Sequence, residues 1–155
     1  MMNFSLTVNI THQIIRILFI FFLLPVFSVH ATTDFSAVLV ASKYSSISPL
    51  KTNDIRRIFL GLRPVNSTQL ATPVINISDQ HTYIQFLKNI MYLTERGYQR
   101  KLIKRVFRQG ADNIQVINSH EKLAQWLRDN PDSFSYMLKQ DAEKQPELKI
   151  IQVLW

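Results

Sequence analysis

Apolar and polar positions divide the chain into one long apolar run near its start and a series of shorter runs beyond it. The long run, residues 17–24, follows Arg16 and is ended by Pro25. It is shorter than the roughly 20 residues that a membrane-spanning helix needs. Ala31 and the valine two positions before it provide the small side chains that a signal peptidase recognises. This pattern predicts a secretory signal peptide over residues 1–31, with cleavage after Ala31.

The signal peptide predicts that residues 32–155 form one exported domain that works in the periplasm. An uncleaved N-terminal anchor is the alternative, and the chain would then touch the membrane only through this segment. Export also changes the expected partners. A basic chain in the cytoplasm would favour nucleic acid, whereas an exported one is expected to meet small anions or envelope proteins instead.

Beyond the signal, short apolar runs of strand length alternate with stretches in which apolar residues recur every three or four positions. Strands are predicted at residues 35–41, 71–77, 114–117, 134–138 and 148–154. Helices are predicted at residues 53–60, 78–91 and 94–108 and between residues 118 and 129, with a charged loop at 140–147. This alternation, without internal repeats or a second domain, predicts a three-layer α/β fold.

Polar residues mark where these helices are expected to begin. Thr52 is the predicted N-cap of the first helix, and Ser78 or Asp79 that of the second. Asn118, followed three residues later by Glu121, has the spacing of a capping box before the last helix.

The charge of the chain is concentrated in one predicted helix. The sequence has 18 Lys and Arg against 11 Asp and Glu, a net charge of +7. The helix at 94–108 carries six of the basic residues: Arg96, Arg100, Lys101, Lys104, Arg105 and Arg108. Arg96, Arg100 and Lys104 are spaced by four and form one stripe, while Tyr98, Leu102 and Val106 are expected to pack inward. This stripe is either a surface for anions or an acidic partner, or simply the solvated side of an amphipathic helix.

Catalytic chemistry is not expected. The chain has no cysteine, which excludes disulfides, thiol catalysis and Cys-based metal sites. The exported part has two histidines, His81 and His120, in no metal-binding spacing, and no nucleophile-elbow or glycine-rich phosphate loop is present. His120 is interpreted as a solvated surface residue. We therefore expect no enzyme activity, no cofactor and no metal.

The junction between the second strand and the second helix is the candidate ligand site. A helix N-terminus offers unpaired backbone N–H groups and the positive end of its dipole to an anion. Ser78, His81 and Thr82 add side-chain donors at this junction. The alternative is an ordinary N-cap by Ser78 or Asp79, whose carboxylate would compete with an anion.

The order of these segments resembles the phosphate-transporter substrate-binding-protein-like family, the small branch of the type 2 periplasmic-binding-protein fold. The most specific element is T-N-D-I-R-R-I-F-L-G at residues 52–61, followed by Pro73-Val74 in a strand and Phe86 in a helix. V-F-R-Q-G at residues 106–110 and D-N-P at residues 129–131, with F-S-Y soon after, resemble further segments of the family.

The resemblance implies a periplasmic solute-binding fold and a phosphate-like ligand. Full-length phosphate binders carry an R-x-D-G-S-G-T-T-like stretch at the junction. Counted back from Phe86, its arginine falls on Asn76, and its aspartate and serine fall on Ser78 and Gln80. Only its first threonine has a match, Thr82. A periplasmic interaction module that kept the fold but lost the ligand site is therefore the alternative function.

Overall fold

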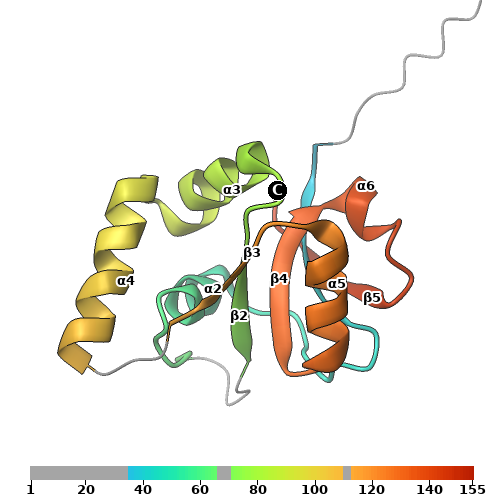
Figure 1. Cartoon of the computed structure of the whole chain (residues 1–155), viewed down its shortest axis with the longest axis horizontal. Helices are drawn as coiled ribbons and strands as arrows, with labels where there is room; N and C mark the ends of the chain where they lie inside the picture. Colours follow the sequence, from blue (N-terminus) through green and yellow to red (C-terminus); the bar gives the residue numbers. More distant parts are fainter. Residues whose placement is uncertain (1–34, 66–70, 110–112) are drawn as a thin grey trace, which may run out of the picture. The chain divides into compact units, whose positions relative to one another are not determined.

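Five strands form one mixed sheet in the computed structural model of the chain, in the order β3-β2-β4-β1-β5 (Figure 1). They are β1 (Ala37–Ser42), β2 (Thr72–Asn76), β3 (Gln115–Ile117), β4 (Ser133–Leu138) and β5 (Leu148–Val153). β1 pairs antiparallel with both β4 and β5, whereas β2 pairs parallel with both β3 and β4. The predicted strands are confirmed, because each begins and ends close to its predicted limits.

The structure describes residues 35–65, 71–109 and 113–155. These residues belong to one compact unit, Asp34–Trp155. The predicted signal peptide and its cleavage site lie outside the described residues, so both stay predictions. In the part of the chain that the structure describes, no helix is both long enough and apolar enough to span a bilayer.

Helices cover both faces of the sheet. They are α2 (Thr52–Phe59), α3 (Gln80–Phe86), the π-helical η1 (Leu87–Met91), α4 (Glu95–Gln109), α5 (His120–Asp129) and α6 (Lys139–Ala142). Residues of α2, α3, η1 and the first part of α4 pack on one face, and residues of α5 and α6 pack on the other. Side chains of β1 alternate between the two cores, with Leu39 in the first and Val38 in the second. The predicted three-layer α/β arrangement is confirmed.

Four aromatic rings form the centre of the larger core. Phe59 of α2 lies edge-on to Phe86 of α3 and to Phe134 of β4, at centroid distances of 4.8 and 5.4 Å. Phe86 stacks on Tyr136 of β4 at 3.8 Å. All four side chains are fully buried. This cluster therefore holds α2 and α3 against β4, the strand next to β2.

Two predicted helix caps are wrong by one residue. Thr52 is the first residue of α2, and Lys51 occupies the N-cap position without a side-chain hydrogen bond. Ser119, not Asn118, is the N-cap of α5. Its hydroxyl oxygen accepts a hydrogen bond from the backbone N–H of Lys122, three residues later, at 3.4 Å. The same hydroxyl donates to Glu121. Each helix thus begins one residue away from the position that the side-chain pattern indicated.

The segment predicted as one helix over residues 78–91 changes geometry partway. α3 ends at Phe86, and the chain continues as the π-helix η1 to Met91. Tyr92 then ends it in the left-handed conformation, with φ of 53°, and its ring lies 4.3 Å from the Arg56 guanidinium carbon. A second difference is α6, which forms within the predicted charged loop.

Candidate functional site

Two neighbouring parallel strands end side by side at the candidate site. Asn76, the last residue of β2, pairs in register with Ile117, the last residue of β3. β2 leads into α3 on one face of the sheet, and β3 leads into α5 on the opposite face. In open α/β sheets, ligands bind in the crevice at such a switch point, outside the carboxyl ends of the strands. The N-termini of α3 and α5 therefore flank the expected position of a ligand.

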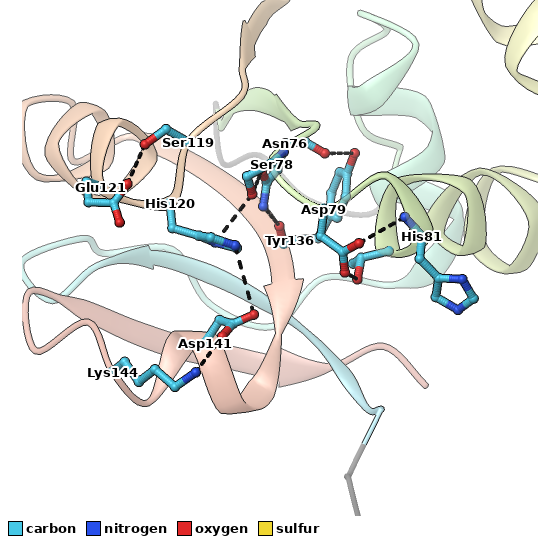
Figure 2. A network of polar contacts seen from close by, with 11 residues as sticks. Asn76, Ser78, Asp79, His81, Ser119, His120, Glu121, Tyr136, Asp141 and Lys144 are labelled. Atoms are coloured by element: carbon cyan, nitrogen blue, oxygen red, sulfur yellow. Dashed lines mark hydrogen bonds and ion pairs between the residues drawn. The ribbon is translucent and has the colours of Figure 1, made fainter.

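Asn76 anchors this end of the sheet. Its side-chain amide donates to the Tyr136 carbonyl oxygen, and the Tyr136 hydroxyl donates to the Asn76 carbonyl oxygen, both at 2.9 Å (Figure 2). Burial raises the pKa of the Tyr136 phenol well above its usual range, so the hydroxyl remains a donor. The amide oxygen of Asn76 stays available for the residue two positions later.

Ser78 uses that oxygen. Its backbone N–H and its hydroxyl both donate to Asn76 Oδ1, at 3.0 and 2.5 Å. The Ser78 hydroxyl oxygen also lies 3.3 Å from Nδ1 of His120, in the first turn of α5. Since the Ser78 proton points to Asn76, we infer that His120 Nδ1 is the donor in the second contact. Ser78 thus connects the starts of α3 and α5.

Asp79 caps α3 and binds two donors that were expected to serve a ligand. Its carboxylate accepts from the His81 N–H at 2.9 Å and from the Thr82 hydroxyl. Partial burial opposes ionisation of this carboxyl, but the hydrogen bonds from Thr82 and His81 outweigh it, and the pKa of Asp79 is lowered. Asp79 is therefore an anion already held at the predicted site.

The side chains of the three predicted ligand residues point in three different directions. Ser78 faces Asn76 and His120, and the buried Thr82 faces Asp79. His81 is exposed, and Figure 2 shows its ring directed away from Ser78. Only the backbone N–H of His81 takes part in the polar network drawn at the junction.

His120 is the residue of this site that sequence reasoning missed. Its side chain is 28% exposed, so the interpretation as a solvated surface residue is wrong. Its Nε2 lies 4.0 Å from the Asp141 carboxylate, which also accepts from Lys144 Nζ at 2.9 Å (Figure 2). The residues Ser78 and His120 are far apart in sequence, and only the parallel pairing of β2 with β3 brings them together.

Serine, histidine and aspartate also make up hydrolase triads, but the contacts here differ from those of a triad. A triad histidine accepts the serine proton, whereas the Ser78 proton is directed to Asn76. No group of three or more His, Asp or Glu side chains able to hold a metal ion occurs among the described residues. The geometry is that of a polar network at the carboxyl ends of β2 and β3.

The sequence matches no protein-family model and no curated protein. Its structure is similar to that of an ABC-type phosphate transport receptor from Vibrio cholerae, with a TM-score of 0.55 and 16% identity over 76% of this chain and 45% of the receptor. It is also similar to PstS from Borrelia burgdorferi, with a TM-score of 0.50 and 17% identity over 76% of this chain and 46% of PstS.

The chain spans less than half the length of both of these proteins. The described part of the chain contains the mixed five-stranded sheet with helices on both faces. The chain therefore has the α/β fold of phosphate-binding receptors, in the form of a small type 2 periplasmic-binding-protein-like domain.

Proposed function

We propose that this protein is an exported solute-binding-like protein of the periplasm that recognises phosphate or another small anion. The observation that carries the proposal is the meeting of two helix N-termini at the ends of adjacent parallel strands, in a fold shared with phosphate receptors. The anion would lie in the crevice between α3 and α5. Ser78, His81 and Thr82 remain the proposed ligand residues, with His120 added from the structure.

Charges at the crevice set the expected strength of binding. The net charge of +7 would attract an anion. Three carboxylates act against this: Asp79 caps α3, Glu121 lies in the first turn of α5, and Asp141 lies 4.0 Å from His120 Nε2. The hydrogen bond from Ser119 is the main reason that the pKa of Glu121 is lowered. We therefore propose weak binding, in which the anion competes with Asp79 for the Thr82 hydroxyl and the His81 N–H.

Inorganic phosphate is expected to raise the Tm of the purified protein by several degrees at saturation, measured at fixed pH by differential scanning fluorimetry. A ligand at about 100 times its Kd stabilises a protein by roughly 2.7 kcal/mol. Asp79→Asn should enlarge the shift, since it removes the competing charge while an amide oxygen can still cap α3. Thr82→Ala and Ser78→Ala should reduce it, because hydrogen bonds to charged groups contribute about 1.5–3 kcal/mol.

Thr72→Ala is the matched control, because Thr72 is an exposed threonine at the start of β2. Its phosphate shift should equal that of the unaltered protein. Identical melting curves in phosphate and in chloride at equal ionic strength would contradict the anion site. An interaction module that kept the fold and lost the site would then be the better account.

Export is tested separately by cell fractionation. We expect a form beginning near Thr32 in the periplasmic fraction, identified by its mass and N-terminal sequence. Reversing the sign of Arg16, in Arg16→Glu, should reduce the amount exported, because the positive end of a signal peptide stays on the cytoplasmic side. Detection of the full-length chain only in the cytoplasm would overturn the proposed location.

A further inference from the structure

A groove separates the second half of α4 from the edge of the sheet. Tyr98 holds the first half of α4 in the core, where its hydroxyl donates to the Phe59 carbonyl oxygen at 2.6 Å. Beyond Tyr98, a groove of about 480 Å³ opens between α4 and the edge strand β3. Leu102 and Val106 line one wall, and Ile75 and Val116 line the other. Leu102 and Val106, both expected to pack inward, are only half-buried.

Large apolar side chains at the rim of this groove are exposed. Phe107 is 85% exposed, Ile103 is 55% exposed, and Val116 of β3 is 47% exposed. Ile103 and Phe107 are four residues apart and lie next to each other on α4. Exposed apolar surface gathered around a concave apolar groove is typical of a binding surface for another protein.

Basic residues surround this apolar surface. Arg100 and Lys104 are exposed, and each lies three residues before an apolar residue of the rim, Ile103 and Phe107 respectively. Among the described residues that line the groove there is no aspartate or glutamate, whereas Arg105 is one of them. The Arg105 Nε is buried and has no hydrogen-bond partner among the described residues, so an acceptor from a ligand would satisfy it. The groove is therefore apolar on both walls and basic along α4, which is complementary to a ligand that is apolar and negatively charged.

We propose that the groove between α4 and β3 binds an acidic amphipathic segment of a partner protein. Its apolar side chains cover Ile103, Phe107 and Val116, and its carboxylates face Arg100, Lys104 and Arg105. Two facing apolar walls suit an inserted segment, since a flat membrane surface would contact the outer side of α4 alone. A second copy of this chain would bring another net charge of +7 to the same place, which opposes self-association. The inference is independent of the anion crevice.

The test uses a fluorescent synthetic helical peptide with leucines on one face and glutamates on the other, titrated with the purified protein and followed by anisotropy. Phe107→Ser should weaken binding at least tenfold, as expected for an anchor residue. The double variant Arg100→Glu, Lys104→Glu should weaken binding of the acidic peptide at least tenfold. The same double variant should bind a peptide in which lysines replace the glutamates more tightly than the unaltered protein does. All three residues are exposed, so folding should be unchanged.

Matched controls lie elsewhere on the surface. Tyr44→Ser removes a side chain that is 72% exposed, and Lys88→Glu reverses an exposed charge on η1. Both should leave peptide affinity unchanged. Equal binding by all variants, or equal binding of a peptide with the same residues in scrambled order, would overturn the proposal. Binding to phosphatidylglycerol vesicles that depends on Phe107, without any peptide binding, would also overturn the proposal. So would a dimer that forms through Phe107, detected by analytical ultracentrifugation.

Discussion

Replacement of Phe59 by alanine is expected to lower the free energy of unfolding by about 3–5 kcal/mol. The Phe59 ring is fully buried and contacts Phe86, Phe134 and Tyr136. Its removal leaves a cavity at the point where α2, α3 and β4 meet, and a close-packed core relaxes only in part to fill it. Urea unfolding followed by circular dichroism measures the loss, which is a large share of the 5–15 kcal/mol typical of a whole domain.

Phe107→Ala is the matched control for this variant, because Phe107 is the most exposed large apolar side chain among the described residues. Its change in stability should stay within about 0.5 kcal/mol. Phe59→Leu provides an intermediate case if the alanine variant does not fold, and should cost less because it keeps most of the buried volume. Equal losses for Phe59→Ala and Phe107→Ala would contradict the described core.

Replacement of Asn76 by alanine should cost about 2–4 kcal/mol and also disturb the candidate site. Each buried polar group left without a partner costs about 1–3 kcal/mol. The variant removes the donor to the Tyr136 carbonyl oxygen and the acceptor used by the Ser78 N–H and hydroxyl. The Ser78 hydroxyl would then be free to turn, and the proposed stabilisation by phosphate should fall.

Asn118→Ala serves as the control, since Asn118 is exposed in the loop between β3 and α5. It should change stability by less than about 0.5 kcal/mol. Chemical denaturation gives the stability of both variants, and scanning fluorimetry with phosphate gives the effect on the site. An Asn76→Ala protein as stable as the Asn118→Ala protein would show that the buried hydrogen bonds of Asn76 contribute little.

The sequence predicts most of the fold because strand and helix periodicity is strong in this chain. The fully buried β1 and the amphipathic α2 are both evident from their apolar positions. The helix starts were harder to predict, because neighbouring polar residues such as Asn118 and Ser119 can both act as caps. The π-helical turn after Phe86 could not be predicted, since it depends on how Leu87 and Ile90 fit the core.

The sequence indicates where a candidate site could lie but not how its residues contact one another. The junction after β2 is identifiable from a strand that runs directly into a helix cap. The contact between Ser78 and His120 depends on strand order, which places the three-residue β3 beside β2. The exposure of Phe107 could not be predicted for a similar reason. Periodicity places Phe107 on a helix but does not show whether the sheet extends far enough to cover it.

The position of β1 between β4 and β5 also has a consequence for when the sheet can form. β1 is the first strand of the described domain, and both of its partners come from residues 133–153. Ribosomal synthesis therefore delivers β1 long before the two strands that flank it. Contacts between residues so distant in sequence slow folding, because a long loop must close before the pairing is gained. The nascent chain should stay open until its last strand has emerged, which is the state in which a polypeptide can still be threaded through a narrow pore.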